Sequence, residues 1–470
     1  MRYLCMLSMW WVAGNADAAT YYMDDSSTPG CADAVGQDGS VAEPWCTLSY
    51  AQRRLSGGDR LIIRNGDDGV YHETGSVIFD SGNSGNKGAP TVIMADAGAA
   101  PEINGPGINS GRVRLGASDH SGIAWVEFGR GITITNFNQG LFVEAGVDIT
   151  ISGLTIHNVG QEGLRIKSNS ARVTVENTTV HNAGVNGRNG ECFYIGTGSA
   201  GPVDNSTDIT IKHSTAYNCT HEGVDIKAGS RNVIFENNII HDAMTAEPYA
   251  SGMLRVGMCK NGAQNCGAVS PAHIVRNNTV YGFTGDAGIS VQTGAHVYNN
   301  VIYGISGGAQ GILVQNPNSD SHVRFLYHNT IAGGEDAAVR VEAGTVESRN
   351  NIGPPTAGSN IAFDSSFFVD APSNDYHLVE DARPVDNGEE LNGVVTTDKD
   401  GVPRVINGAA DQGAFELGVS PAGTQHMAAL SKGFLSFVDS LSRRPPRRYS
   451  SSSCLAMNRP PPPHGTWSCE

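Results

Sequence analysis

The sequence predicts an all-β fold, a parallel β-helix made of stacked coils, and two repeating patterns support this prediction. A strand-like segment recurs seven times, and its successive starts lie 29, 31, 30, 35, 23 and 27 residues apart. The seven segments begin at Glu162, Glu191, Glu222, Gly252, Ala287, Gln310 and Ala337. A single short strand cannot bury a face, whereas stacked coils give each strand a partner about 4.8 Å away and build one continuous core.

The second pattern is an apolar segment that ends in Asn and lies between the repeats. Its Asn residues are Asn177, Asn237, Asn277, Asn299 and Asn329. Asn is common in turns, where its amide can stack and hydrogen-bond along a column of coils. We therefore expect these side chains to form a ladder at one turn of the solenoid. His181 and His241 occupy similar places in their coils and are expected to be stacked turn residues rather than bases.

The register of the seven segments places charged residues in columns. One column holds Arg165, Tyr194, Asp225, Arg255, Ser290, Leu313 and Arg340, and a second holds Lys167, Gly196, Lys227, Gly257, Gln292 and Gln315. Side chains alternate along a strand, so both columns should face outward while the residues between them face the core. These core residues are Ile166, Ile195, Ile226, Val256, Val291 and Val314. Glu162, Glu191 and Glu222 form a third column beside the turn.

The chain is expected to have four parts. Residues 1–18 combine a basic start, a short apolar run and small residues at a cleavage site, which is typical of a secretory signal peptide. Residues 19–75 form a capping module, in which Thr47 begins a short helix that ends before Gly57-Gly58 and covers the first coil. Residues 76–418 form the catalytic β-helix domain. The Ser-, Pro- and Arg-rich residues 419–470 form a disordered tail.

Composition restricts the partners and the compartment. The formal charge is −16, and the six basic residues after Gly418 outnumber the acidic ones there by four, so residues 19–418 carry −20 and should repel nucleic acid. No apolar run has the length of a membrane span. The eight cysteines after the signal favour disulfides in an exported, extracellular or periplasmic protein, expected to be a monomer. Sequential pairing gives Cys31–Cys46, Cys192–Cys219, Cys259–Cys266 and Cys454–Cys469.

Acidic residues on neighbouring coils indicate a cation site. Glu191, Glu222 and Asp225 would repel one another at one coil spacing unless a cation or a basic group lay among them. Together with Asn189 they offer only oxygen ligands, which suit Ca²⁺ rather than Zn²⁺. The nearby basic residues are Arg165, Lys167, Lys227 and Arg255. The alternative is a solvated face whose charges only pair with one another.

Two resemblances to known families follow from these residues. The capping module and the segments at 374–378, 398–404 and 411–417 resemble the ends of secreted bacterial right-handed parallel β-helix proteins of the pectate-lyase-like superfamily. Asn189-Gly190-Glu191, Glu222 with Lys227, and Ser251 to Gly257 resemble the site of polysaccharide lyase family 6, which includes alginate lyases and chondroitinase B. This second resemblance covers about seventy residues.

The resemblances imply a single right-handed parallel β-helix and a set of site residues. Asn189, Glu191 and Glu222 are the implied calcium ligands, Lys227 the base and Arg255 its partner. Val224 and Val256 stand where the lyase family has a further calcium Glu and a His. Asp225 is the expected replacement ligand.

These residue types suit β-elimination on a uronic acid. A base removes the C5 proton while the C4 oxygen leaves, and the proton is acidic enough only when the sugar carboxylate is neutralised. We expect Ca²⁺ to neutralise it and Lys227 to act as the uncharged base. The acidic polysaccharide, whether alginate, pectate or a glycosaminoglycan, is expected to bind Arg165, Lys167, Tyr194 and His221. His221 is also a reserve candidate for proton transfer.

Other functions remain open on the same residues. A glycoside hydrolase needs two carboxyl groups, which Glu191, Glu222 and Asp225 could supply. A C5-epimerase would share the proton abstraction, and a non-catalytic adhesin or carbohydrate-binding solenoid would show the same repeats. The loops at 184–190, 196–208, 243–249 and 258–271 favour an enzyme, because they cluster over the charged coils and can wall a groove.

Overall fold

The computed structural model describes residues 18–418, except 29, 117–120, 199–203, 244–251, 259–271, 284, 318–320, 334–337, 354–357, 392 and 407. Nearly all of the predicted signal peptide, the predicted tail, and the predicted pairs Cys259–Cys266 and Cys454–Cys469 lie outside the described residues. The other two predicted pairs, Cys31–Cys46 and Cys192–Cys219, are confirmed as disulfides.

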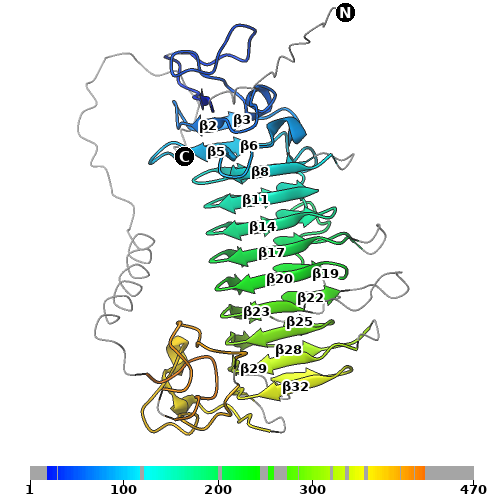
Figure 1. Ribbon diagram of the computed structural model, residues 1–470, viewed down its shortest axis with the longest axis vertical. Coiled ribbons are helices and arrows are strands. Elements are labelled where there is room, and N and C mark those ends of the chain that lie inside the picture. The colour runs from blue at the N-terminus through cyan, green and yellow to red at the C-terminus, as the bar shows by residue number, and fades with distance from the viewer. Residues whose placement is uncertain are drawn as a thin grey trace, which may run out of the picture. The chain divides into compact units, whose positions relative to one another are not determined.

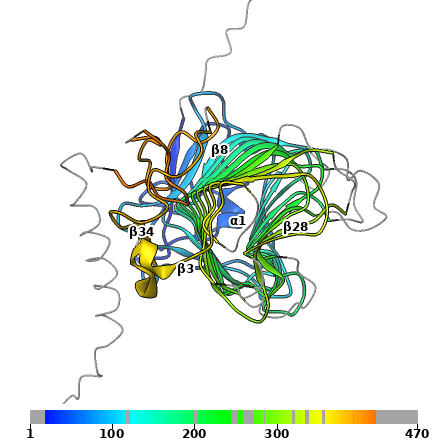
Figure 2. The same cartoon turned by 90° about the horizontal axis from the view of Figure 1, so that it is seen from below.

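Residues 20–349 fold into the predicted parallel β-helix. Each full coil contributes one strand to each of three sheets, and the sheets enclose the core (Figures 1 and 2). Along the chain, a coil passes from sheet 1 to sheet 2 and then to sheet 3. Strands of neighbouring coils pair in parallel, as β11 with β14, β12 with β15 and β13 with β16 do.

The strands belong to the three sheets as follows. Sheet 1 contains β1 (Thr20–Met23), β2 (Arg60–Ile63), β5 (Thr91–Ala95), β8 (Ile123–Phe128), β11 (Gly146–Ser152), β14 (Ala171–Glu176), β17 (Thr207–Lys212), β20 (Arg231–Glu236), β23 (His273–Arg276), β26 (Ala295–Tyr298), β29 (Arg324–Tyr327) and β32 (Val346–Arg349). Sheet 2 contains β3 (Val70–His72), β6 (Glu102–Asn104), β9 (Thr133–Thr135), β12 (Thr155–Val159), β15 (Thr179–Ala183), β18 (Thr215–Tyr217), β21 (Ile239–His241), β24 (Thr279–Phe283), β27 (Val301–Ile305) and β30 (Thr330–Ile331). Sheet 3 contains β4 (Val77–Phe79), β7 (Val113–Leu115), β10 (Leu141–Glu144), β13 (Leu164–Lys167), β16 (Phe193–Ile195), β19 (Val224–Lys227), β22 (Leu254–Met258), β25 (Ala287–Val291), β28 (Gln310–Val314) and β31 (Val339–Val341).

One apolar core runs through the coils. The residues predicted to point inward from sheet 3 are all 0% exposed, namely Ile166, Ile195, Ile226, Val256, Val291 and Val314. Phe79 packs edge-on against Phe128 and Phe193 against Phe235, with ring centroids 6.0 and 6.5 Å apart. The predicted alternation is therefore confirmed on sheet 3, and the residues between these core positions lie on its outer face.

The capping helix α1 (Leu48–Ala51) covers the first coils, as Figure 2 shows. Thr47 is confirmed as the N-cap, because its Oγ1 accepts a hydrogen bond from Tyr50 N at 3.2 Å. Leu48 and Ala51 are fully buried in the end of the core. The helix ends earlier than the predicted stop at Gly57-Gly58, and the buried Asn83 amide binds the carbonyl oxygens of the next turn, at residues 52 and 55.

A ladder of Asn side chains lies in the turn between sheets 1 and 2, but one residue later than predicted. The ladder runs through Asn238, Asn278, Asn300, Asn329, Asn351 and Asn360, each amide donating to the next. Of the predicted members only Asn329 belongs to it. The predicted Asn177, Asn237, Asn277 and Asn299 instead adopt φ between 50° and 59°, a conformation that Asn tolerates well.

Truncating one member of the Asn ladder is expected to destabilise the protein. Asn300 is 0% exposed, accepts from Asn278 N at 3.0 Å and donates to Val275 O at 3.0 Å. Asn300→Ala should lower the free energy of unfolding by at least about 1–3 kcal/mol, because buried backbone groups lose their partners. Asn237→Gly is the control and should change it by only a few tenths, since Gly also adopts positive φ. Equal losses in both variants by denaturant unfolding would contradict the ladder's role.

Histidine and tyrosine rings stack on one another along sheet 2. The stack includes His181 and His241, which were expected to be stacked turn residues. The stack contains His157, His181, Tyr217, His241, Tyr281 and Tyr303, with neighbouring centroids 4.5 to 5.0 Å apart. The prediction that both histidines stack is confirmed, but their placement in turns is wrong, because His181 lies in β15 and His241 ends β21. The charged columns lie on a different sheet.

The segment after β32 packs against the last coils. It contains the antiparallel pair β33 (Phe368–Asp370) and β34 (Asp375–Leu378). The 3₁₀ helices of the chain are η1 (Ser81–Asn83), η2 (Ser365–Phe367) and η3 (Ala371–Ser373). Residues 397–413 follow the turn beside the Asn ladder, where Asn299 donates to Thr397 O at 2.8 Å and accepts from Arg404 at 2.7 Å. This segment therefore satisfies polar groups of the turn that the coils alone leave open.

Candidate active site

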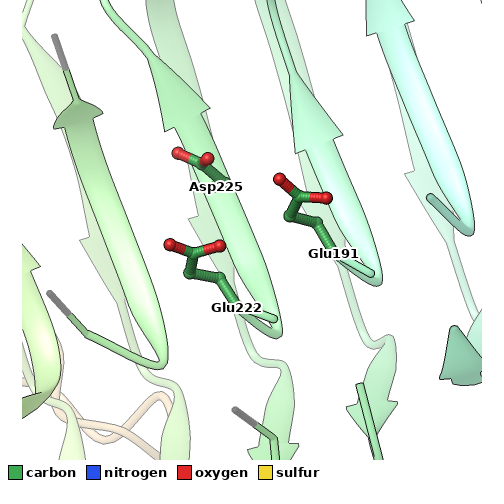
Figure 3. Close-up of side chains that lie close together, drawn as sticks. All are labelled: Glu191, Glu222 and Asp225. Atoms are coloured by element: carbon green, nitrogen blue, oxygen red, sulfur yellow. The ribbon is translucent and has the colours of Figure 1, made fainter. Parts of the chain in front are cut away.

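The outer face of sheet 3 brings the predicted site residues together. The predicted column is confirmed, because β16 pairs Tyr194 with Asp225 of β19, and Asp225 pairs with Arg255 of β22. Glu191 and Glu222 lie just before β16 and β19, at the same turn of consecutive coils. Figure 3 shows their carboxylates beside that of Asp225.

Three carboxylates form a compact buried cluster. One oxygen from each of Glu191, Glu222 and Asp225 lies within 4.8 Å of the others. The three residues are 6%, 2% and 0% exposed. The residues predicted to face outward do so, but they are not solvated, because stacked side chains of neighbouring coils shield one another. A merely solvated face is therefore the wrong description of this cluster.

Asp225 is the centre of an ion-pair network. Arg255 donates from Nε and Nη2 to its two carboxylate oxygens, at 3.2 and 2.7 Å. The Nζ of Lys227 contacts the same carboxylate. Arg255 Nη2 also lies 2.5 Å from Glu222 Oε1, so one guanidinium joins two carboxylates. Lys227 and Arg255 are 8% and 5% exposed, and such buried charges need partners of this kind.

The three carboxyl groups differ in their ionisation. Burial raises the pKa of Glu191 to about 8, and the Asp225 and Glu222 carboxylates add to the effect. Burial and Asp225 also raise the pKa of Glu222, although Arg255 opposes them. Burial works against ionisation of Asp225 too, but Arg255 and Lys227 hold its pKa below the ordinary value. Asp225 is therefore the ionised member, while Glu191 takes up a proton near neutral pH unless a cation replaces it.

Glu191 has an open coordination position. Its Oε2 is buried and has no hydrogen-bond partner among the described residues. Oxygens that bind one Ca²⁺ at 2.3–2.6 Å lie at most about 5 Å apart, so the cluster spacing of 4.8 Å or less fits a calcium ion. Among the residues that the structure describes, two cations, Lys227 and Arg255, pair with the three carboxylates, which leaves one negative charge for a proton or a metal to balance. The donor set and the charge both fit Ca²⁺.

Tyr194 lies between two of the predicted cations. The guanidinium carbon of Arg165 lies 4.2 Å and the Nζ of Lys227 4.9 Å from the centroid of its ring. Arg165 also donates to Glu162 Oε1 at 2.9 Å. Burial and Asp225 raise the pKa of Tyr194, so its phenol stays protonated. The side chain therefore separates the Arg165 and Lys227 charges.

The other predicted site residues lie around this centre. Lys167 Nζ is 2.5 Å from Glu144 Oε1, so it pairs outside the carboxylate cluster. Asn189 is exposed in the loop before Glu191 and makes no hydrogen bond within the described part of the chain. His221 Nδ1 lies 3.3 Å from Thr220 Oγ1, next to Glu222. The structure brings together Glu191, Tyr194, Glu222, Asp225, Lys227 and Arg255, with Arg165 at the edge.

One predicted column position is wrong. Lys227 pairs with Met258 and not with Gly257, because the register shifts after Ile226. Gly257 has φ 82°, which only Gly adopts easily, and a Cβ there would lie 2.3 Å from the Thr293 side chain. On the other side of Lys227, Gly196 is confirmed as its neighbour, since a Cβ at Gly196 would lie 3.0 Å from Lys227 Cβ. Gly196 thus leaves room for the lysine.

The part of this face that precedes Glu162 was not predicted from the sequence. Glu144 binds Lys167 and lies 3.0 Å from Arg114 Nε. Arg112 and Lys167 lie over the Phe142 ring, at 4.9 and 5.7 Å from its centroid. The signal was present, since Gly140-Leu141-Phe142-Val143 matches Gly163-Leu164-Arg165-Ile166. The aromatic residue in the charged column concealed this repeat.

A disulfide connects the segments that carry two of the carboxylates. Cys192 follows Glu191, and Cys219 lies three residues before Glu222. Both cysteines are fully buried. The covalent link across 27 residues therefore fixes the separation of the two coils where the cluster needs it.

Glu191 should make the stability of the metal-free protein depend on pH. Its folded-state pKa of about 8 is above that of an unfolded Glu, about 4.3. The folded state thus binds the proton more tightly, and this stability is fully present below about pH 4 and lost as the pH rises through about 8. In chelator, the free energy of unfolding should fall by about 1.4 kcal/mol per pH unit between these values relative to Glu191→Gln. The measurement is denaturant unfolding at several pH values. If the free energy of unfolding depended on pH in the same way in both proteins, this prediction would be refuted.

Comparisons with known proteins agree on the fold. A family model described as a right handed beta helix region matches residues 118–270. Among solved structures, pectate lyase Pel9A is 18% identical, with 86% of this chain and 97% of that chain covered and a TM-score of 0.55. An alginate lyase from Paenibacillus sp. str. FPU-7 is 16% identical (73% and 99% covered, TM-score 0.50), and a glycoside hydrolase is 11% identical (73% and 97% covered, TM-score 0.52).

The comparisons confirm the right-handed parallel β-helix as the fold. No protein of curated function matches the chain by sequence. Within the described ranges, no helix is long and apolar enough to cross a membrane. Of the loops predicted to wall a groove, 243–249 and 258–271 lie almost entirely outside the described residues, and so do residues 199–203 of the loop at 196–208. The loop at 184–190 is described in full.

Proposed function

We propose that this right-handed parallel β-helix protein is a secreted polysaccharide lyase that cleaves a uronic-acid-containing polymer by calcium-assisted β-elimination. The observation that carries the proposal is the buried cluster in which Glu191 has an open oxygen beside Glu222 and Asp225. Lys227 and Arg255 lie in contact with the same cluster. Alginate, pectate and glycosaminoglycans are the candidate substrates, because each has a carboxylate next to an acidic C–H bond.

The charge of the outer face of sheet 3 favours a polyanion. Between β7 and β22, its basic residues are Arg112, Arg114, Arg165, Lys167, Lys227 and Arg255, and its acidic residues are Glu144, Glu162, Glu191, Glu222 and Asp225. Residues 19–418 as a whole carry −20. These residues give a positive excess of one on an otherwise acidic body, and the excess rises to two once Glu191 holds a proton. A uronate polymer would therefore be attracted to this face and repelled elsewhere.

Lys227 is the proposed base. Its partner Asp225 is also held by two N–H groups of Arg255, so the carboxylate keeps a counter-charge when Lys227 is the neutral amine. The amine takes the C5 proton while the C4–O bond breaks and a double bond forms between C4 and C5, and the departing oxygen takes a proton from water. Arg255 acts here as a positioning residue that compensates Asp225.

Glu191 and Glu222 would hold the calcium ion, with Asp225 and Asn189 as further proposed ligands. When bound, the ion would neutralise the substrate carboxylate and make the C5 proton more acidic. Tyr194 keeps its phenolic proton and can donate it in a hydrogen bond to a sugar oxygen. Arg165, Lys167 and His221 are proposed to bind the neighbouring sugar units.

Export of the protein is part of the proposal. The described part of the chain contains two disulfides, and such bonds form and persist in extracellular or periplasmic compartments. The proposed polysaccharide substrate is also located outside the cytoplasm. We propose that the exported protein acts as a monomer.

A glycoside hydrolase is the second candidate, and one observation favours it. The pKa of Glu191 is raised and that of Asp225 is lowered, which is how a general acid and an ionised partner are separated. Their spacing is less favourable. The clustered oxygens lie within 4.8 Å of one another, whereas the carboxyl groups of retaining hydrolases lie about 5–5.5 Å apart and those of inverting hydrolases farther.

The chemistry of the product distinguishes the two candidates. The protein would be incubated with alginate, polygalacturonate, chondroitin sulfate and dermatan sulfate in calcium. A lyase yields new reducing ends together with the ultraviolet absorbance of the unsaturated uronate. New reducing ends without this absorbance would establish a hydrolase instead. If no polymer gave either signal, a binding or structural role for the solenoid would be the remaining explanation.

A further inference from the structure

A hollow of about 480 Å³ lies on the outer face of sheet 1, on a different sheet from the carboxylate cluster. It extends over four consecutive coils, those of β8, β11, β14 and β17, because Trp125, Asp148, Arg172 and Asp208 all line it. Gly88 and Pro90, in the loop before β5, form one border. At about 4.8 Å per coil, the lining residues span roughly 14 Å, which is room for a short oligosaccharide.

Four of the lining residues belong to a column in which every residue has an unusual backbone conformation. Trp125, Asp148, Arg172, Asp208 and Asn232 have φ of 55°, 56°, 53°, 57° and 48°. They lie opposite one another in consecutive strands, between paired neighbours such as Val147 with Ala124 and Ile149 with Val126. The repeated conformation is thus a feature of the coil. Asp and Asn tolerate it, whereas Trp and Arg do so at a cost in free energy.

Trp125 is the aromatic member of this column. Its side chain is partly exposed and borders the hollow. Within the described residues its ring stacks on no other aromatic ring, and its indole N–H has no hydrogen-bond acceptor. A strained, partly exposed Trp at the edge of a hollow is the arrangement expected of a binding platform. The C–H face of a pyranose ring packs well against such a surface.

A second, smaller hollow continues the first. Its volume is about 180 Å³, and it shares Glu127 and Thr150 with the larger one. It adds Arg130 and Glu176 to the lining. The two hollows together give one surface that offers an indole, hydroxyl groups, carboxylates and guanidinium groups. This mixture can hydrogen-bond to sugar hydroxyls, which both donate and accept.

The charge of this surface selects the ligand class. Its carboxylates are Glu127, Asp148, Glu176 and Asp208, and its cations are Arg130 and Arg172. Arg172 is already bound to Asp148 through two hydrogen bonds of 2.7 and 2.8 Å. Glu176 is paired with Lys212 at 3.1 Å, so Glu127 and Asp208 remain against Arg130. A polyuronate would gain no net attraction from these groups, whereas uncharged hydroxyl groups can donate to the carboxylates. We infer that the outer face of sheet 1 is a second carbohydrate-binding site, for a neutral oligosaccharide stacked on Trp125.

Affinity electrophoresis of the full mature chain tests this inference. Native gels would contain galactan, glucomannan, xyloglucan or mixed-linkage β-glucan, with polygalacturonate as the acidic comparison. The wild type should be retarded by at least one neutral polymer. Trp125→Asn should weaken this binding at least 10-fold while the protein melts no earlier than the wild type, because Asn readily adopts the positive φ of this position. Glu127→Ala should weaken it about 3- to 10-fold.

Two controls separate this site from the rest of the molecule. Arg231→Ala removes an exposed cation of β20, in the same sheet, that lines neither hollow, and it should bind like the wild type. Lys227→Ala should also keep the neutral-polymer binding, because it alters a different sheet. The inference is overturned if no neutral polymer retards the wild type, if Trp125→Asn binds as well as the wild type, or if only polygalacturonate binds.

Discussion

Replacing Lys227 with alanine is expected to lower kcat/KM on the uronate polymer by about 10²–10⁴-fold, the usual contribution of a positioned base. Lys227 is the amine in contact with the carboxylate cluster, and it lies 4.9 Å from the ring centroid of Tyr194. Without it, Arg255 remains, but a guanidinium does not act as a base near neutral pH. The rate of appearance of unsaturated product measures the effect.

Lys167 provides a matched control for Lys227. It ends β13, two coils earlier on the same outer face, but pairs with Glu144 rather than with the cluster. Lys167→Ala should raise KM by less than about 10-fold and leave kcat nearly unchanged, because it removes only substrate binding. If both variants lost activity to the same extent, or if Lys227→Ala kept its kcat, Lys227 would not be the base.

Arg255→Met is expected to have the largest effect on stability. Arg255 is 5% exposed and is the common partner of Asp225 and Glu222. Removing one partner of a buried ion pair typically costs about 3–5 kcal/mol, because the remaining charge stays buried without compensation. Thermal unfolding in chelator should show a large fall in Tm, and added Ca²⁺ should restore part of it by compensating the carboxylates.

A second substitution tests the reason for this loss. Asp225→Asn in the Arg255→Met background removes the uncompensated charge, so the double variant should be more stable than Arg255→Met alone. If Arg255→Met had the same Tm as the wild type in chelator, the ion-pair network would not be what stabilises the cluster. Equal Tm values for the single and double variants would show that the loss has another cause.

The fold could be predicted well because it depends on simple periodicity. Ile166, Ile195 and Ile226 recur at the spacing of the coils, and the alternation of side chains then requires Arg165, Tyr194 and Asp225 to face outward. Sequential pairing was sufficient for Cys31–Cys46 and Cys192–Cys219, since each pair lies within or between adjacent coils.

Local irregularities could not be read from the same pattern. The register shift after Ile226 changes the partner of Lys227 from Gly257 to Met258, and periodicity contains no information about such a shift. The Asn ladder was placed one residue too early, because consecutive Asn residues such as Asn237 and Asn238 differ only in backbone conformation. Both errors concern single residues and leave the coil repeat intact.

The position of the site could be predicted from the sequence, but the electrostatics of the site could not. The sequence places Glu191, Glu222 and Asp225 on adjacent coils, yet only the three-dimensional structure shows that all three are buried and that Glu191 has an open oxygen. It also shows that Asp225, expected as a replacement calcium ligand, is mainly the partner of Arg255 and Lys227. Ionisation depends on burial and on distances, which spacing along the chain does not give.

The most direct measurement of the central claim follows unsaturated product by ultraviolet absorbance on alginate, polygalacturonate and chondroitin sulfate, with either Ca²⁺ or chelator. We expect the wild type to form product on one of these polymers in Ca²⁺, to stop in chelator and to recover when Ca²⁺ is added back. Glu191→Gln should need a higher Ca²⁺ concentration, because it loses a charged ligand. Product formation that is the same in chelator and in Ca²⁺ would contradict the calcium-assisted mechanism, and no product on any polymer would contradict the lyase itself.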